Sequence, residues 1–204
     1  MELMEYSKAH SLLLKYGIKN VESRYVDSAN EAVSFSKGSP IVLKVISSKA
    51  LHKSKNKLVA LNLSSKNDIV QEFKSLESTA KKFKPYKILA QKMVGNGLEI
   101  IMGGKTDQQF GKMVLIGLGG IYVETFRDFA LRICPIERHD AEAMLQQLKS
   151  RQVIAPDKAS SDMLVDLLLK VSKMFTENKI TELDLNPIIL HDGTYDAVDL
   201  RIIR

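Results

Sequence analysis

The sequence is poor in the residues on which disulfide scaffolds and membrane anchors depend. It has one cysteine in 204 residues, Cys134, so no internal disulfide can form, which fits a reducing compartment. Its longest nearly apolar run, residues 113–123, is interrupted by glycines and is far shorter than the roughly 20 residues needed to span a bilayer. The first five residues include two acidic ones, where a secretory signal would be basic. We therefore expect a folded cytoplasmic protein with no membrane partner.

Tryptophan is absent and aromatic residues make up only 6% of the chain, so the sequence offers no stacking platform for nucleic-acid bases. The net charge is nevertheless +6, which points to anionic partners. The basic residues are dispersed along the sequence, and we do not expect nucleic acid as a partner. Small phosphate-bearing substrates explain the charge as well as a diffuse solvated surface does.

The pattern of apolar residues predicts an α+β protein of two lobes. Periods of three or four residues predict helices, and short apolar runs predict strands. The expected helices are 2–16, 29–37, 69–83, a segment beginning at 144 and 163–175, and the expected strands are 41–46, 58–63, 87–94, 98–102, 113–116, 121–126, 129–133 and 181–186. Strands cluster after about residue 90 instead of alternating with helices, which does not fit one doubly wound sheet. We expect an N-terminal lobe with a leading helix over 1–94, a C-terminal lobe over 95–204, and a hinge near 91–97.

The C-terminal segment has the pattern of a hairpin with a polar face. Asp192-Gly193 is a strong two-residue turn signal, and this turn would pair residues whose numbers sum to 385. Asn186 would then face Asp199, and Asp184 would face Arg201. Because directly opposed residues share one face of a sheet, Asn186 and Asp199 could hold one Mg²⁺, whose remaining ligands are phosphate and water. The alternative is an exposed polar face on an edge hairpin.

Three further features are compatible with phosphate chemistry, and each also has a purely structural explanation. Glycines 117, 119 and 120 follow an apolar run, where backbone N–H groups can approach a phosphate, or they form only a tight turn. Lys44 lies within the apolar run 41–46, where it needs an anionic ligand or extends its amine to water. His52 lies among basic residues and could accept a phosphoryl group, or it is a surface histidine without a role.

Together these segments resemble the ATP-grasp β subunit of ADP-forming acetyl-CoA synthetases and, more weakly, the β subunit of succinyl-CoA synthetase. The order and spacing of the motifs agree over nearly the whole chain. The motifs are residues 41–44, His52-Lys53-Ser54, 91–99, Gln109-Phe110-Gly111, 117–124, 182–187 and 197–202.

The resemblance implies an ATP-grasp fold in which two α+β lobes enclose ATP or ADP with Mg²⁺. It implies the reaction acyl-CoA + ADP + phosphate ⇌ acid + CoA + ATP, through an acyl phosphate and a phosphohistidine. It further implies that CoA binding and the histidine first phosphorylated belong to a separate α subunit, in an α2β2 heterotetramer.

The resemblance also implies roles for individual residues. His52 matches a histidine that relays the phosphoryl group, Asn186 and Asp199 match Mg²⁺ ligands, Lys44 matches a lysine that contacts phosphate, and Glu99 matches an acid that binds ribose hydroxyls. The remaining expected nucleotide-binding residues are Lys53, Gln91, Lys92, Val94, Gly119 and Gly120.

The chain departs from the family pattern after His52. Relatives typically continue with Asp-x-Gly-Gly-Val, whereas this chain reads Lys55-Asn56-Lys57-Leu58-Val59, without either glycine. A loop without glycine has restricted access to positive φ, and its side chains stand where backbone would approach phosphate. Lys92 also stands where the family usually has Glu. These differences leave a second hypothesis, a non-catalytic or regulatory ATP-grasp module with a degraded phosphate loop.

Overall fold

The computed structural model describes residues 2–47, 49, 58–120 and 127–204. The chain forms two compact units, one made of Met1–Asn20 with Gly95–Arg204 and the other of Val21–Val94. Each unit is built on an antiparallel sheet. None of the helices in the described part of the chain combines the length and apolar character that a bilayer span requires.

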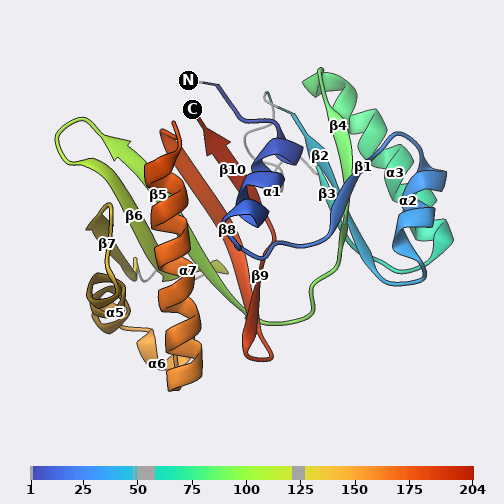
Figure 1. Cartoon of the computed structure of the whole chain (residues 1–204). Helices are drawn as coiled ribbons and strands as arrows, with labels where there is room; N and C mark the ends of the chain where they lie inside the picture. Colours follow the sequence, from blue (N-terminus) through green and yellow to red (C-terminus); the bar gives the residue numbers. More distant parts are fainter. Residues whose placement is uncertain (1, 48, 50–57, 121–126) are drawn as a thin grey trace. The chain divides into compact units, whose positions relative to one another are not determined.

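The smaller unit carries a four-stranded sheet in the order β1-β4-β2-β3. Its elements are β1 (Ser23–Val26), α2 (Ala29–Ser36), β2 (Ile41–Ile46), β3 (Val59–Leu63), α3 (Lys66–Ala80), the short 3₁₀ helix η1 (Lys81–Phe83) and β4 (Lys87–Lys92). Helices α2 and α3 lie on the same side of this sheet (Figure 1). Ile41, Leu43 and Val45 alternate along β2 and are buried in the core beneath these helices. The other side chains of β2 therefore project to the opposite face.

The larger unit carries a six-stranded sheet in the order β10-β8-β5-β6-β7, with β9 also paired to β8. Its elements are α1 (Tyr6–Lys15), β5 (Leu98–Asp107), β6 (Gly111–Leu118), β7 (Phe129–Ile133), α5 (Arg138–Gln147), α6 (Arg151–Ile154), α7 (Lys158–Glu177), β8 (Glu182–His191), β9 (Thr194–Ala197) and β10 (Leu200–Ile203). Helix α7 runs across one face of the sheet (Figure 1). Gly104 of β5 leaves room for the Phe175 ring of this helix, because a Cβ there would lie 3.1 Å from the ring. We call the opposite face of the sheet the open face.

The structure differs from the expected elements mainly where contacts are distant in sequence. The helix expected over 2–16 begins at Tyr6, and the residues before it run alongside β10, where the Glu2 and Met4 amides donate to the Arg204 and Ile202 carbonyls. Strand β1 and helix α6 were not expected, and β5 and β6 are longer than predicted. The expected strand 121–126 lies outside the described residues. The boundary between Val94 and Gly95 falls within the expected hinge.

The leading helix α1 differs from the expected lobe assignment, because it packs in the larger unit instead of with Val21–Val94. It packs against β10, and the Tyr16 hydroxyl just after it donates to Glu177 at the end of α7, 2.8 Å away. Leu13 is fully buried, whereas Leu14 beside it is 54% exposed. Packing between distant parts of the chain therefore decides where this helix belongs.

We predict that Leu13→Ala destabilises the larger unit selectively. Loss of a buried leucine costs about 2–5 kcal/mol, and amide hydrogen exchange should quicken in β10 and α7 while Val21–Val94 keeps its protection. Leu14→Ala, on the same helix but exposed, is the matched control and should change neither. Faster exchange in Val21–Val94 alone would contradict the assignment of α1 to the larger unit.

Candidate functional site

The first group of expected residues lies on the small sheet, on the face away from α2 and α3. Lys44 is 5% exposed and Gln91 is 1% exposed. In the register of β2 with β4, Gln91 opposes Val42, and Lys44 is two residues further along β2. Lys44 and Gln91 are thus diagonal neighbours on one face. The structure brings these two candidates together.

Lys92 lies on the other side of that sheet. Its ammonium group donates to the carbonyls of Phe35 and Ser36, at 2.9 and 2.8 Å, and lies over the Phe35 ring. These carbonyls are at the C-terminal end of α2, where a cation is favourable. The side chain is thus used to cap a helix, and any ligand contact from position 92 has to come from its backbone. Val94 follows β4 and is half-buried.

A second group forms around the glycine turn after β6. The Gly119 amide donates to the Glu99 carbonyl at 2.8 Å. A Cβ on Gly119 would lie 2.8 Å from the Glu99 carbonyl carbon, which is closer than real Cβ atoms approach. Gly120 has φ +70°, in the left-handed region, and its Cβ position is 3.1 Å from a Glu99 carboxylate oxygen. The structure thus packs the glycine turn directly against Glu99.

The third group lies on strand β8 and on the segment after it, and its predicted register is confirmed. His191 pairs with Thr194 across the turn, and Arg201 pairs with Asp184. Between these pairs the backbone N–H of Asn186 donates to the backbone carbonyl of Asp199 at 3.3 Å. Asn186 is therefore opposite Asp199, as the hairpin arithmetic required. Among the described residues no cluster of three or more His, Cys, Asp and Glu could hold a metal, so a metal here would take one amide and one carboxylate oxygen, with other ligands from outside the protein.

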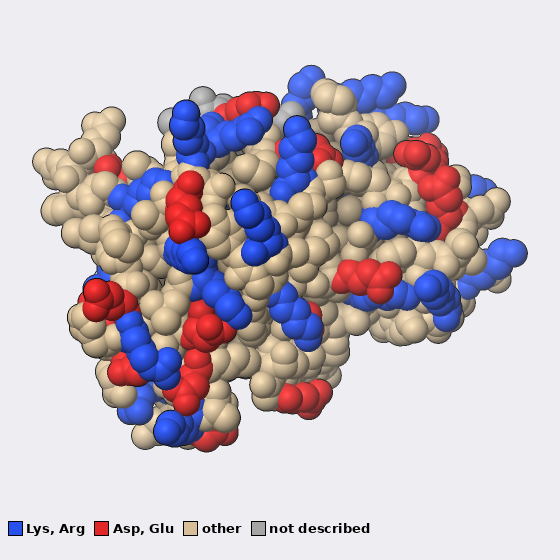
Figure 2. All heavy atoms as spheres, viewed as in Figure 1, with Lys and Arg blue, Asp and Glu red and all other residues tan. Residues whose placement is uncertain are grey.

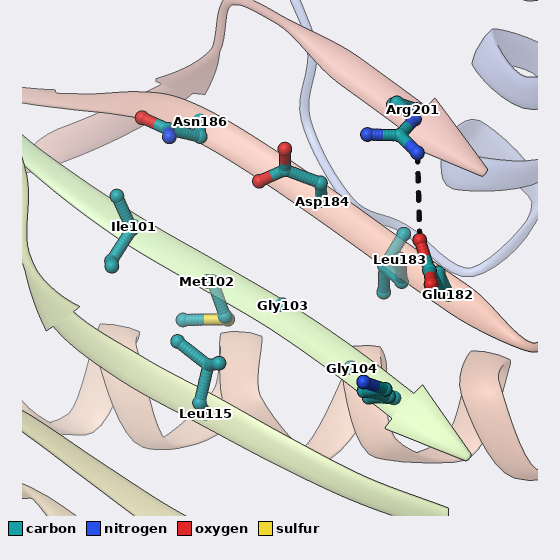
Figure 3. A pocket seen from close by; sticks show the side chains of 11 residues that line it. Ile101, Met102, Gly103, Gly104, Leu115, Glu182, Leu183, Asp184, Asn186 and Arg201 are labelled. Atoms are coloured by element: carbon teal, nitrogen blue, oxygen red, sulfur yellow. Dashed lines mark hydrogen bonds and ion pairs between the residues drawn. The ribbon is translucent and has the colours of Figure 1, made fainter. Parts of the chain in front are cut away.

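Asn186 and Asp184 project from the same side of β8 over a hollow on the open face (Figure 3). The hollow has a volume of about 320 Å³ and includes Gly103 and Lys105 of β5 in its lining. An ion pair joins Arg201 to Glu182, with Nη2 and Oε2 3.5 Å apart. Both side chains are partly exposed, so the pair contributes little stability. The hollow offers charges of both signs and room for a polar ligand next to Asn186.

Asp128 is a positioning residue for which no sequence motif provides a signal. Its buried carboxylate accepts hydrogen bonds from the Lys149 and Ser150 amides, at 2.9 and 2.8 Å, and from the Ser150 hydroxyl. Its carbonyl accepts from Leu118, at the start of the glycine turn. Burial, the largest influence, raises the pKa of Asp128, but the hydrogen bonds from Ser150 and Lys149 outweigh it, so the net pKa is lowered. Asp128 therefore ties the glycine turn to the link between α5 and α6.

His52 and Lys53 lie outside the described residues, so the structure does not place them. The segment that contains them leaves the sheet at the end of β2 and returns at Leu58, which is fully buried and whose carbonyl accepts from the Val45 amide at 2.9 Å.

Comparison with known proteins decides the family. The ATP-grasp domain model matches residues 2–203. The β subunit of ADP-forming acetate–CoA ligase II from Pyrococcus furiosus is 34% identical, over 98% of this chain and 91% of that protein. The ADP-forming acetate–CoA ligase I from Archaeoglobus fulgidus is 38% identical over 92% of this chain, which corresponds to 28% of that longer protein.

This chain belongs to the ATP-grasp β subunits of the ADP-forming acetate–CoA ligases. The solved relatives agree with this assignment. An acetyl-coenzyme A synthetase from Ca. Korarchaeum cryptofilum, in complex with coenzyme A and Ca-AMPCP, matches with a TM-score of 0.88 and 34% identity over 97% of this chain and 91% of that one. Another structure of that enzyme holds coenzyme A and Mg-AMPPCP, with a phosphohistidine segment pointing towards the nucleotide binding site, and has a TM-score of 0.83 and 32% identity over 98% and 92% of the two chains.

The family resemblance and the α+β ATP-grasp fold expected from the sequence are therefore confirmed. The structure brings together Lys44 with Gln91, Glu99 with Gly119 and Gly120, and Asn186 with Asp199, while it separates the Lys92 side chain from its expected neighbours. The roles of these residues in this ATP-grasp subunit remain predictions.

We predict that Asp128→Asn destabilises the protein by about 1–3 kcal/mol, since an amide leaves one of the buried donors without an acceptor. Because the pKa of Asp128 is lower in the folded protein, the ionised carboxylate stabilises the fold at pH values above its unfolded-state pKa of about 4. This stabilisation is lost as the pH falls through the folded-state pKa. Urea unfolding between pH 6 and pH 3 should therefore show a steeper loss of stability for the wild type than for the variant.

The matched control is Asp157→Asn, which removes a carboxylate that caps α7 by accepting from the Ser160 amide at 2.7 Å. Exchange of the Leu118 and Gly119 amides should quicken in Asp128→Asn but not in this control. Equal acid sensitivity of wild type and Asp128→Asn would contradict the role of Asp128.

Proposed function

We propose that this chain is the nucleotide-handling subunit of an ADP-forming acyl-CoA synthetase, and that it moves a phosphoryl group between a partner's phosphohistidine and ADP. The whole complex would catalyse acyl-CoA + ADP + phosphate ⇌ acid + CoA + ATP. The observation that carries this proposal is the pairing of Asn186 with Asp199 in a chain that matches a ligase β subunit along nearly its full length.

Asn186 and Asp199 fit Mg²⁺ because they supply one amide and one carboxylate oxygen, and Mg²⁺ usually binds one or two protein oxygens together with phosphates and waters. When bound, the ion neutralises charge on the phosphates. Lys44 would contact phosphate and Glu99 the ribose hydroxyls. The glycine turn, which packs against Glu99, would approach the nucleotide through its backbone N–H groups.

Gln91 and Val94 would complete the nucleotide site, with Lys92 contributing through its backbone. The solved relative with Mg-AMPPCP supports a nucleotide and Mg²⁺ as ligands of the family. These assignments rest on the placement of Lys44 and Gln91 on one face of the small sheet and of Glu99 against the glycine turn.

His52, with Lys53 beside it, would relay the phosphoryl group. A ring nitrogen of neutral His52 attacks phosphorus, and the N–P bond to the partner's histidine breaks with its electron pair returning to that ring. A β-phosphate oxygen of ADP then attacks phosphorus, the N–P bond to His52 breaks, and ATP forms with the His52 ring neutral again. Each ring keeps the N–H on its other nitrogen while it carries the phosphoryl group, so each ring is neutral again when its N–P bond breaks and no proton is gained or lost.

The partner would be an α subunit that binds CoA and carries the phosphohistidine, in an α2β2 complex. Relatives named as β subunits support a separate partner, and the much longer single-chain relatives support its covalent equivalent. The reducing interior of the cell would be its location. The comparisons give no support to the alternative of a regulatory module.

Asp199→Asn should weaken Mg-ADP binding at least tenfold, because a neutral amide is a poorer Mg²⁺ ligand than a carboxylate. Isothermal titration with Mg-ADP measures this, and ADP with EDTA should bind wild type and variant alike. Asp192→Asn is the matched control, since it makes the same chemical change at the exposed hairpin turn and should leave affinity unchanged. Equal affinities of the wild type and the Asp199 variant would overturn the metal site.

His52→Ala should abolish phosphoryl transfer to ADP while the affinity for Mg-ADP stays within about twofold, because the relay histidine forms a covalent intermediate and does not bind the nucleotide. Rapid-quench assays with the phosphorylated partner measure transfer, and titration calorimetry measures affinity. His139→Ala, at an exposed position of α5, is the control and should retain full turnover. Unchanged turnover in His52→Ala would rule out the relay.

A further inference from the structure

The net charge of the protein is divided unevenly between its two units. The unit Val21–Val94 contains fourteen basic and six acidic residues, a net charge of +8, so the larger unit has a net charge of −2. Within the smaller unit, residues 49–57 and 81–87 each contain four lysines and no acidic residue. The whole excess of the unit therefore comes from two short segments, and its other charges cancel.

Lys49, the one described lysine of the first segment, and the segment 81–87 lie at the same end of the small sheet. Ile46, the last residue of β2, pairs with Lys87, the first residue of β4. The Ser47 hydroxyl donates to the Phe83 carbonyl at 2.6 Å and accepts from the Lys49 amide at 3.1 Å. These contacts hold the start of the His52 segment against η1.

We call the resulting feature the basic surface, and it consists of Lys49, Lys81, Lys82, Lys84 and Lys87. All five side chains are exposed. Among the residues that the structure describes, no carboxylate forms an ion pair with the amines of Lys49, Lys81, Lys82 or Lys84. Lys and Arg side chains gather over the C-terminal end of α3 in the space-filling view (Figure 2).

The helix dipole explains part of this arrangement. Lys81 and Lys82 follow the C-terminal end of α3, where positive charge is favourable. Lys84 and Lys87 lie beyond that turn, and Lys49 comes from a different part of the chain. A capping role therefore does not account for the gathering of all five lysines, whose mutual repulsion lowers stability.

We propose that the basic surface is a docking surface for an acidic face of the partner subunit that carries the phosphohistidine. The proposal rests on the proposed function, which makes that partner the source of the phosphoryl group. Lys49 of the basic surface precedes the proposed relay residue His52 by three residues in the sequence, so the basic surface is close along the chain to the residue that would accept the partner's phosphoryl group. Charge complementarity of this kind increases the rate of association more than the final affinity.

A protein partner fits the basic surface better than a nucleotide does. Lys87 shares the face of Lys44 and Gln91 but lies at the end of the sheet, opposite Ile46, whereas Lys81, Lys82 and Lys84 lie in and just after η1, off the sheet. The lysines of the basic surface form a broad exposed area, whereas a nucleotide needs a concave site. The exposed lysines also keep their full hydration until a partner arrives, so the attraction acts over about a Debye length, roughly 10 Å at 0.1 M salt.

The test compares two double variants that remove the same charge from the same unit. K82E/K84E alters the basic surface in and after η1, whereas K66E/K74E reverses two exposed lysines of α3 that are not part of the basic surface. Stopped-flow anisotropy would follow association of each protein with the labelled, phosphorylated α subunit from the same organism, without nucleotide, at low and high salt. Circular dichroism and urea unfolding establish that each variant is folded.

We expect K82E/K84E to slow association about tenfold at low salt and to flatten its salt dependence. K66E/K74E should stay within about twofold of the wild type, and both variants should turn over normally at saturating partner. Equal slowing by both variants would show that only net charge acts and would overturn the proposal, as would no slowing by either.

Two other results would also overturn it. One is a parallel loss of Mg-ADP affinity in K82E/K84E, which would place the lysines in the nucleotide site. The other is that K82E/K84E loses binding to an oligonucleotide while it associates with the partner as fast as the wild type does, which would make nucleic acid the ligand of the basic surface. Failure of the proposed function is distinguishable, because a wild-type chain that binds the phosphorylated partner at a salt-dependent rate but forms no ATP leaves the docking surface intact.

Discussion

The register of strand β8 is the constraint on which the candidate site depends. Side chains alternate along a strand, so a slip of one residue would bury Asp184 and Asn186 and expose Leu183 and Leu185. The Asp192-Gly193 turn fixes β8 against β9, and the same register continues through Asn186 opposite Asp199 to Arg201 opposite Asp184. The buried leucines under α7 and the polar residues on the open face are thus two consequences of one pairing.

Strand β8 is joined to the rest of the sheet through its neighbour β5, which also lines the hollow. Strand β5 pairs with β8 on one side and with β6 on the other, so its first residues bring Glu99 against the glycine turn, while Gly103 lies opposite Asp184. Asp128 then links that turn to the helical layer behind the sheet. The residues proposed to bind ribose, phosphate and Mg²⁺ in the larger unit are therefore positioned by backbone pairing, and they need no long flexible connection.

The sequence was sufficient for features that depend on local pattern. The hairpin register followed from one turn signal, and α7 followed from its regular apolar spacing. Features set by distant contacts were missed or misplaced. No local signal shows that α1 packs beside β10, that the Lys92 ammonium caps α2, or that the Asp128 carboxylate receives the amides of Lys149 and Ser150.

One of the two missing glycines of the phosphate loop has a structural explanation. Leu58 stands where relatives typically have glycine, and it is fully buried in the core of the smaller unit. Replacing it with glycine would leave a cavity in that core and would cost stability. Position 58 therefore contributes to packing in this chain, and the change there is compatible with an active enzyme.

The proposed reaction requires this chain to pass a phosphoryl group from its partner to ADP. A single-turnover experiment detects that transfer itself, when the partner carries ³²P on its histidine and is mixed with this chain and Mg-ADP. We predict that the label appears in ATP, in an amount close to that of the phosphorylated partner, and only when this chain is present. Label that remains on the partner, although calorimetry shows Mg-ADP bound to the chain, would contradict the proposed transfer.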